Sequence, residues 1–413
     1  MARETPLVAL DVGTSKVCAL IGEPGPDQTV KVLGFSESKS DGLRKGVIVN
    51  IERTIAAIQQ AVEEAENQAG IDASSVIVGI SGGHIKSQNS RGMTGVGRHD
   101  KEISQDDVKR AIEAAKAVAI PIDREVVHVI PYGFIIDGQD GIRDPVGMLG
   151  VRLEVDVHII TGAVTSVQNL IKSINRAGFD VDGIVLEPMA SAESILTEDE
   201  KDLGVAMVDI GGGTSDIVIY LNGTVRHSEV VSLGGEHVTR DISLGLRTPH
   251  ERAETIKRSY GCALVSMISN GQTIAVPSVG DRRDREVALR EMVEIIEIRM
   301  DELMRLIQME IQLTGYNELI GGGVVLTGGA SLLPGIVEMT EGIFGCPVRI
   351  GKPRYIANSE DFPGLDSPAY ATVTGLARHG LYQRGKRDTF GPSVFGTFGK
   401  LFERVGEWVR TNL

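Results

Sequence analysis

Two short segments, about half a chain apart, combine an aspartate with glycine and hydroxyl residues in the same order. Asp11-Val12-Gly13-Thr14-Ser15 and Asp209-Ile210-Gly211-Gly212-Gly213-Thr214-Ser215 each lie between two apolar runs that have the pattern of strands. Glycine reaches positive φ at little cost and lets backbone N–H groups approach a phosphate. The pattern predicts that the two turns bind one polyphosphate through Gly13, Thr14, Ser15, Lys16, Gly211, Gly212, Gly213 and Thr214.

Each segment begins with an aspartate at the end of a predicted strand. Asp11 and Asp209 are candidate ligands of a hydrated Mg²⁺, which prefers oxygen ligands and keeps several of its waters. Asp209 is also a candidate catalytic residue. A lone glycine-rich turn is more often a simple tight hairpin. The recurrence of the turn, together with a third Thr-Gly-Gly after a strand pattern at Thr327, favours nucleotide binding, and the sequence has no P-loop motif.

The repeat also predicts the fold class. Strand, turn and strand occur over Leu7–Ile21 and again over Val205–Tyr220, which indicates two similar α/β lobes with a cleft between them. In the first lobe, the hydrophobic spacing predicts helices over 54–68 and 166–177, with strands at 75–80 and 181–186.

Other segments differ from these lobes in composition and in the pattern of their apolar residues. Residues 84–161 include a glycine-rich stretch and a helix that begins after Ser104, and we expect them to form an inserted subdomain. A second helical block is predicted over Glu286–Leu313, and a last core helix over Ser367–Leu381. Residues 383–391 are polar and are expected to form a flexible linker before a final segment, residues 392–413.

Composition excludes several classes of protein. The 413 residues carry a net charge of −14, which argues against nucleic acid as a partner because phosphate binding needs a basic surface. Three widely spaced cysteines and the absence of an export signal indicate the cytosol. No run of about 18 apolar residues is present, so we expect no membrane-spanning helix.

The two turns resemble the phosphate hairpins of the actin, Hsp70 and sugar-kinase superfamily. Thr327-Gly328-Gly329-Ala330 is similar to the adenosine motif of that superfamily, which implies that Gly328, Gly329 and Ala330 contact the nucleoside. Glu254-Thr255-Ile256-Lys257-Arg258 resembles its Glu-x-x-Lys-Arg element, which implies that Glu254, Lys257 and Arg258 embrace ribose and adenine. Without the other motifs, this helix face would be a solvated charge cluster. The resemblance implies that the cofactors are ATP and Mg²⁺.

Within that superfamily the chain resembles the FtsA family over nearly its whole length. The resemblance is carried by Asp209–Asp216, Arg247–Pro249, Ala253–Lys257 and Val324–Ser331, and by His128–Pro131, Asp144–Met148 and Gly150–Arg152 in the insertion. It implies an actin-like, two-lobed ATPase fold with an FtsA-type subdomain inserted in the first lobe. The implied subdomains are 1A (residues 1–83, 162–203 and 355–382), 1C (84–161), 2A (204–236 and 319–354) and 2B (237–318).

Glu187 follows the predicted strand Ile184–Leu186, where several ATPases of the superfamily place a glutamate that orients water on the γ-phosphate. The alternative is a structural turn at Glu187-Pro188. Since members of the FtsA family turn over ATP weakly, we expect ATP binding rather than turnover. A second candidate, the GxSxG pattern at Gly79–Gly83, does not predict a hydrolase, because the residues after it are strand-like and a nucleophile elbow must lead into a helix.

The final segment has the pattern of an amphipathic helix at a lipid surface. Its apolar residues recur at helical spacing, and residues 384–413 carry six basic against three acidic side chains. An alternative is a helix that packs on the protein's own core. The linker, the reversed charge and the FtsA resemblance favour binding to anionic inner-membrane lipids. The predicted membrane-binding residues are Phe395, Phe398, Lys400, Leu401, Phe402, Arg404, Val405 and Trp408.

The FtsA resemblance also implies partners. It implies that subdomain 2B binds the C-terminal peptide of FtsZ, with Arg299 at the family's basic position and Arg305 on the adjacent turn. It further implies a homopolymer, later division proteins on subdomain 1C, and a peripheral location on the cytoplasmic face of the bacterial inner membrane at the division septum. The alternatives are an actin-fold ATPase or kinase, and a type IV pilus assembly adaptor without a lipid-binding tail.

Overall fold

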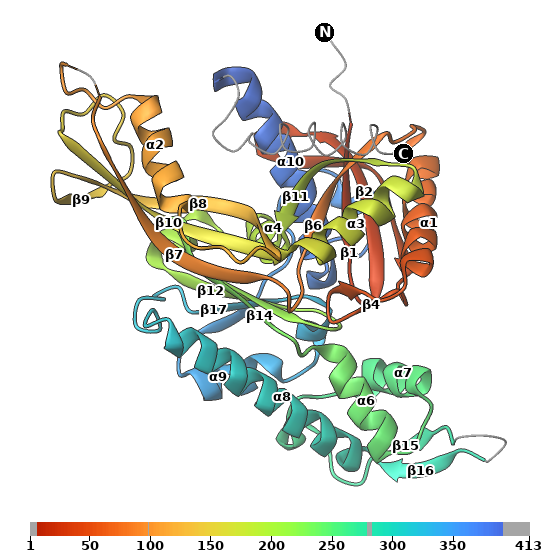
Figure 1. Cartoon of the computed structure of the whole chain (residues 1–413). Coiled ribbons are helices and arrows are strands. Elements are labelled where there is room, and N and C mark those ends of the chain that lie inside the picture. The colour runs from red at the N-terminus through yellow and green to blue at the C-terminus, as the bar shows by residue number, and fades with distance from the viewer. Residues whose placement is uncertain (1–5, 98, 279–282, 391–413) are drawn as a thin grey trace.

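The chain folds into two lobes, each built on a five-stranded sheet, and the two sheets have the same topology (Figure 1). The computed structural model describes residues 6–97, 99–278 and 283–390. In both sheets three strands form an antiparallel meander and two more add in parallel, so the α/β two-lobed fold class is confirmed.

The first sheet has the order β11 (Asp180–Leu186), β6 (Ser75–Ile80), β1 (Leu7–Val12), β2 (Lys16–Pro24) and β3 (Val30–Lys39). The second has the order β14 (Thr224–Val231), β13 (Ser215–Leu221), β12 (Val205–Ile210), β17 (Val324–Thr327) and β18 (Val348–Ile350).

Helices cover both faces of the first sheet. α1 (Ile51–Ala69) and α3 (Val164–Ala177) bury their apolar faces on one side, together with side chains of β1 and β6. α1 begins at Asn50, whose side chain accepts a hydrogen bond from Arg53 N, and it ends at Gly70 in the left-handed conformation. On the other face lie α4 (Glu187–Ile195) and α10 (Ala371–Phe390).

α4 and α10 also pack on the second sheet, so they join the lobes. Ala192 and Ile195 of α4 and Ala371 of α10 share a buried cluster with Val205 and Met207 of β12. The two helices approach closely because Gly375 has no side chain: a Cβ there would lie 1.8 Å from the carbonyl oxygen of Ala190. The short helix α5 (Glu198–Leu203) then leads into β12.

The second lobe has its own helical subdomain after β14. It contains α6 (Gly235–Gly245), α7 (His250–Tyr260), the hairpin β15 (Thr273–Val276) and β16 (Arg285–Ala288), and α8 (Leu289–Leu313); α9 (Ile336–Phe344) follows β17. The helix expected to begin at Glu286 begins at Leu289. Residues 285–288 instead pair with β15, which buries Val287 against Ile274.

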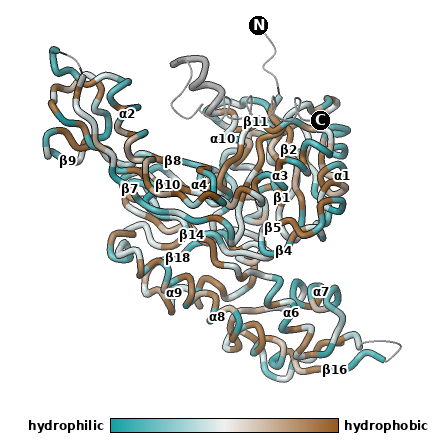
Figure 2. Tube along the Cα trace, in the orientation of Figure 1, coloured by the Kyte–Doolittle hydropathy of each residue, from teal (hydrophilic) through white to brown (hydrophobic). Residues whose placement is uncertain are grey.

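Residues 84–161 form a separate sheet with one helix, inserted between β6 and α3. The sheet has the order β7 (Lys86–Gly95), β10 (Arg152–Ala163), β8 (Arg124–Ile136) and β9 (Gln139–Ile142), and α2 (Gln105–Lys116) covers it. Figure 2 shows hydrophobic segments along the central strands of the molecule and hydrophilic ones along α2. α2 begins at Ser104, which forms a capping box with Asp107.

This insertion reaches across to the second lobe. Ser87 Oγ donates to the carbonyl oxygen of Ser228 at 2.6 Å, and Lys86 pairs with Glu229 at 3.1 Å. His158 Nε2 lies 3.0 Å from Ser228 Oγ and is buried. The insertion on the first lobe is therefore in contact with β14 of the second.

The C-terminal part differs from the expectation for residues 367–391. A 3₁₀ turn, Pro368–Tyr370, precedes α10, and the helix continues to Phe390, so residues 383–390 are helical instead of forming an irregular linker. Gln, Arg and Lys in this stretch are good helix formers, and a single glycine, Gly385, costs only about 1 kcal/mol. Among the described helices, none has the length and apolar character needed to cross a bilayer.

Candidate functional site

The two glycine-rich turns of the repeat meet between the lobes. A Cβ on Gly213 would lie 2.6 Å from Thr14 Oγ1, and a Cβ on Gly212 would lie 3.1 Å from the Cβ of Ser15. The first distance is too short for a side chain and the second is tighter than most real contacts, so the approach of the turns depends on glycine at Gly213 and favours it at Gly212. The expectation that the turns of the two lobes face each other is confirmed.

The turns present backbone donors that the protein itself does not use. Among the described residues, none accepts a hydrogen bond from the N–H groups of Thr14, Ser15, Gly212 and Gly213. Thr14 and Gly213 are buried, where an unpaired N–H group is costly. Clustered donors without a side chain in front of them suit an anion with several oxygens, so these residues fit a polyphosphate.

A third loop and a helix join the second turn. Gly328, with φ 82°, leaves no room for a side chain, since a Cβ would lie 2.3 Å from Asp209 Oδ1. The N–H groups of Gly235 and Glu236, at the start of α6, each donate at 2.9 Å to the carbonyl oxygens of Gly211 and Gly212. A Cβ on Gly235 would lie 3.4 Å from the Cβ of Ala330, so the Gly328–Ala330 loop lies beside α6.

α7 places its charged residues at the same point. Lys257 Nζ donates to the carbonyl oxygen of Gly235 at 3.0 Å and pairs with Glu254 at 2.7 Å. Burial is the largest single effect on Glu254 and acts to raise its pKa, but the Lys257 charge and the hydrogen bonds from Lys257, Thr239 and Arg258 together lower it to about 2. Arg258 is largely exposed and pairs with Glu254 at 2.7 Å.

Four carboxyl groups come together behind the turns. Asp11 and Asp209 lie at the equivalent ends of β1 and β12, Asp216 lies opposite Asp209 in the β12–β13 hairpin, and Glu187 begins α4. Asp209 accepts hydrogen bonds from Ser191 at 2.7 Å and Thr372 at 3.3 Å. Among the described residues, no group of three or more potential ligands is arranged to hold a metal ion.

Burial dominates the electrostatics of these carboxyl groups. It raises the pKa of Asp11 and of Asp216 to about 7, and neighbouring aspartates add to the rise. It also raises the pKa of Asp209, while the bonds from Ser191 and Thr372 oppose it. The pKa of Glu187 is raised well above its usual value by burial and then by the charges of Asp11, Asp216 and Asp209. A cation placed beside these carboxyl groups would lower their pKa values again.

Some side chains of the predicted phosphate-binding residues already have partners. Thr214 Oγ1 donates to Asp216 Oδ2 at 3.2 Å, and Thr14 Oγ1 accepts from Gly46 N at 3.1 Å. Lys16 Nζ lies 3.4 Å from Glu37 Oε2 and 3.6 Å from the centre of the Tyr370 ring.

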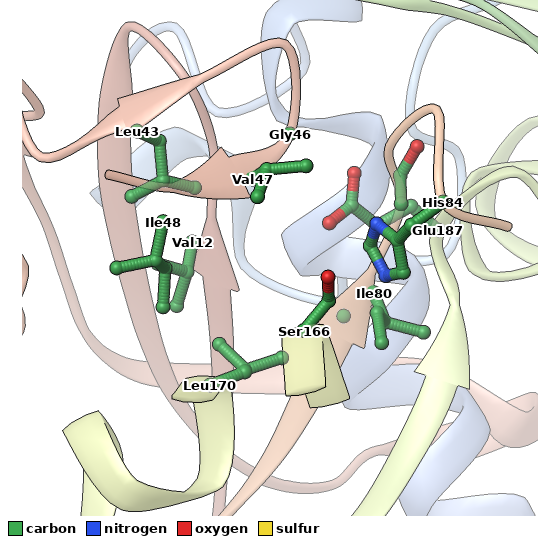
Figure 3. A pocket seen from close by; sticks show the side chains of 12 residues that line it. Val12, Leu43, Gly46, Val47, Ile48, Ile80, His84, Ser166, Leu170 and Glu187 are labelled. Atoms are coloured by element: carbon green, nitrogen blue, oxygen red, sulfur yellow. The ribbon is translucent and has the colours of Figure 1, made fainter. Parts of the chain in front are cut away.

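Glu187 also lines a small pocket in the first lobe, next to the end of β1. Figure 3 shows the His84 ring and the Glu187 carboxyl group at one end, with Leu43 and Ile48 at the other. Both ring nitrogens of His84 are buried and have no hydrogen-bond partner among the described residues, and burial lowers the pKa of His84 to about 4. The turn at Ser81–Gly83 leads into strand β7, which rules out a nucleophile elbow at the GxSxG pattern.

The predicted partner-binding arginines are both paired within the protein. Arg299 on α8 contacts Asp241 of α6 and Glu302, each at 2.5 Å. Arg305 is 62% exposed and makes two bonds to Asp301 at 2.7 and 3.0 Å. The surface between α6 and α8 therefore carries an acidic residue beside each of these two arginines.

Other predictions fall outside the part of the chain that the structure describes. These are residue 391 and the whole segment 392–413, with the predicted membrane-binding residues Phe395, Phe398, Lys400, Leu401, Phe402, Arg404, Val405 and Trp408.

Sequence reasoning missed several residues of the cleft. Asp216 is the clearest, since Ser81 Oγ of the first lobe donates to it and so bridges the lobes. Aligning the two repeats on Thr14-Ser15 and Thr214-Ser215 places Asp216 opposite Lys16, a signal that could have identified it. Ser191, Thr372 and Tyr370 carry no such signal.

Comparison with known proteins gives consistent similarities. A family model described as "Cell division protein FtsA" matches residues 206–375, and one described as "SHS2 domain inserted in FTSA" matches residues 82–161. The cell division protein FtsA of Pseudomonas aeruginosa is 46% identical over 98% of this chain and 98% of its own length. That of Escherichia coli is 37% identical over 98% and 97%.

Solved structures show likeness in fold. The PilM–PilN type IV pilus biogenesis complex matches with a TM-score of 0.66 and 16% identity, over 91% of this chain and 99% of the other. MreB 5 of Spiroplasma citri bound to AMPPNP matches with a TM-score of 0.57 and 15% identity, over 94% and 98%.

Proposed function

The chain belongs to the FtsA family of cell division proteins. On that premise we propose that it binds ATP with Mg²⁺ and polymerises at the inner membrane. We propose that it tethers FtsZ filaments there and recruits later division proteins. The observation that carries the nucleotide proposal is the meeting of the two turns, with four unused N–H groups, between the lobes.

ATP fits the groups around the turns. The N–H groups of the turns bind the phosphates, the Gly328–Ala330 loop and the Glu254–Lys257 pair hold adenine and ribose, and Asp11 and Asp209 hold hydrated Mg²⁺. The MreB 5 structure, of the same fold, is bound to AMPPNP, a non-hydrolysable ATP analogue. The likeness supports the choice of nucleotide.

Calorimetric titration with ATP tests this proposal. Wild-type protein should bind ATP more tightly with Mg²⁺ than with EDTA, and Asp209→Asn should lose most of that difference. Asp199→Asn is a matched control, because Asp199 is an exposed aspartate on α5, away from the turns. A wild-type protein that takes up no adenine nucleotide would refute the proposal.

We propose that turnover is weak at most. The pKa of Glu187 is raised well above its usual value, first by burial, which favours the protonated carboxyl group, and a protonated carboxyl group cannot accept a proton from water. Phosphate release measured over hours should therefore be slow, and Glu187→Gln should leave the affinity for ATP nearly unchanged. Rapid wild-type turnover that Glu187→Gln abolishes would contradict the proposal.

The membrane contact is assigned to the sequence of residues 392–413. Deleting them should abolish co-sedimentation with liposomes of anionic lipid while ATP binding survives, and Trp408→Glu should weaken sedimentation. Retained sedimentation of the truncated protein would reject a lipid-binding tail. Electron microscopy on a lipid monolayer, with and without ATP, tests polymerisation: lipid-dependent filaments are expected.

We assign the FtsZ peptide to the surface between α6 and α8. Exposed Leu244 and Ile298 lie on these helices near the paired Arg299, so the surface offers apolar contact as well as charge. Because Arg299 and Arg305 are already neutralised by acidic neighbours, we expect apolar contact to contribute more than charge.

Binding of a synthetic FtsZ C-terminal peptide, followed by fluorescence anisotropy, tests this assignment. Ile298→Glu should weaken binding at least about tenfold, and Arg305→Glu by only about two- to fivefold. Arg290→Glu is the matched control: Arg290 is also 62% exposed and ion-paired on α8, with Glu294, and it lies about two turns from Ile298 and about four turns from Arg305. Equal losses for all three variants would contradict the assignment.

A kinase and a type IV pilus adaptor are less favoured. The likeness to the PilM–PilN complex is at 16% identity and concerns the fold, whereas the relatives in cell division reach 46%.

A further inference from the structure

Lys16 is held in place by two residues that no sequence motif identifies. Its Nζ lies 3.6 Å from the centre of the Tyr370 ring and 3.4 Å from Glu37 Oε2. The Tyr370 hydroxyl donates to the same Glu37 oxygen at 3.0 Å. Ammonium, ring and carboxylate therefore each contact the other two.

The ring of Tyr370 is itself fixed. Tyr370 ends the 3₁₀ turn before α10, and its backbone N–H donates to the carbonyl oxygen of Ser367 at 3.0 Å. Its ring packs edge to face against Phe35 of β3, with 4.9 Å between ring centres. Burial and then the Glu37 charge raise the pKa of Tyr370, so its hydroxyl group keeps its proton for the bond to Glu37.

Lys16 directly follows the first glycine-rich turn. It follows Ser15 of the first turn, and its carbonyl oxygen accepts from Gly13 N at 3.0 Å. Burial is the main effect on Asp11 and Asp209 and raises their pKa values. The positive charge of Lys16 acts in the opposite direction on both pKa values, so the ammonium group lies within electrostatic range of the two aspartates. A free lysine side chain carries about 2 kcal/mol of rotamer entropy, which a preformed contact removes before ligand binds.

We propose that Tyr370, together with Glu37, is a positioning residue that presents the Lys16 ammonium to the polyphosphate of the nucleotide. This inference rests on the proposed binding of ATP between the two turns. A second contact supports a role for the start of α10: Thr372, two residues after Tyr370, donates to Asp209 at 3.3 Å. The start of α10 thus contacts both a cation and a carboxylate of the cleft.

The test is a double-mutant cycle on ATP affinity with Mg²⁺, measured by calorimetry. Tyr370→Leu should weaken ATP binding about three- to tenfold, because an unrestrained Lys16 must then be ordered on binding. Tyr370→Phe, which keeps the ring face, should remain within about twofold of wild type. In a Lys16→Met background, Tyr370→Leu should cause no further loss, since Tyr370 acts through Lys16.

Tyr355→Leu is the matched control for a purely structural effect. The Tyr355 ring lies 3.7 Å from the Arg378 guanidinium, a similar contact in the same lobe that involves no residue of the cleft. This variant should bind ATP like wild type. The inference is overturned if the loss from Tyr370→Leu persists in the Lys16→Met background, or if Tyr370→Leu binds ATP normally. Wild-type protein that binds no ATP overturns the proposed function as well.

Discussion

Adding one methyl group at Gly213 should separate the two phosphate-binding turns. The Cβ of Gly213→Ala would lie 2.6 Å from Thr14 Oγ1 and 3.0 Å from the backbone N and Cα of Lys45. Thr14 cannot turn away without losing its bond from Gly46 N, and the Lys45 backbone cannot rotate as a side chain can. The clash must therefore move one turn relative to the other.

The free-energy cost of the added methyl group follows from its close contacts with Thr14 and the Lys45 backbone. Overpacking of this kind costs about 1–3 kcal/mol, and the cost applies to the arrangement in which the turns approach each other. If ATP binds only to that arrangement, affinity should fall by about 5- to 150-fold. The unfolding temperature should change little, because the site is at an interface between lobes and not in either core.

Calorimetric titration with ATP and Mg²⁺ measures the affinity, and thermal unfolding measures the stability of the same samples. Gly342→Ala in α9 is the control, since a Cβ there meets no atom within 4 Å and φ is not positive. Gly213→Ala with wild-type affinity and wild-type unfolding temperature would refute the claim that the turns close on the nucleotide. A similar loss of affinity in Gly342→Ala would show that the effect is not specific to the turns.

Three further predictions concern stability. Asp107→Asn should destabilise the inserted subdomain by about 2 kcal/mol, because buried Asp107 accepts from Ser104 and Gly97. Although burial raises the pKa of Asp107, these bonds lower it from 3.8 to about 2, so in pH-dependent thermal unfolding the deficit should be full above pH 4 and shrink towards pH 2. Gly375→Val should cost at least about 3 kcal/mol in chemical denaturation, since any Cβ meets the Ala190 carbonyl group. Burial raises the pKa of Asp216 from 3.8 to about 7, so the folded state keeps a proton that the unfolded state releases. The free energy of unfolding of the wild-type protein without nucleotide should therefore fall as the pH rises from 4 to 7, and this pH dependence should be weaker in Asp216→Asn.

The sequence pattern was sufficient to predict structure wherever the conformation of a short segment depends on its own residues. Strand, glycine-rich turn and strand could be predicted twice, because a short apolar run and the glycine-rich turn that ends it are properties of neighbouring residues. The helix after Ser104 was likewise recognisable from its cap. The fold class followed from the repeat of one such unit.

Contacts between distant segments could not be predicted in this way. Ser81 and Asp216 are joined across the lobes, yet neither residue type nor spacing indicates the pair. The resemblance implied that Arg299 stands at a basic position, but nothing in the sequence indicates that Asp241, far away in the chain, pairs with it. The start of α8 was misplaced because residues 285–288 gain hydrogen bonds from a partner strand that a helical pattern cannot reveal.

The sequence by itself determined which residues form the two turns and that the unit occurs twice, and it predicts an amphipathic helix in residues 392–413. Only the tertiary structure decided that the turns touch, that Tyr370 and Glu37 hold Lys16, and that α4 and α10 join both sheets. The division has a physical cause. Backbone preference and hydrophobic period act over a few residues, whereas packing and charge pairing depend on distances that exist only after the chain has folded.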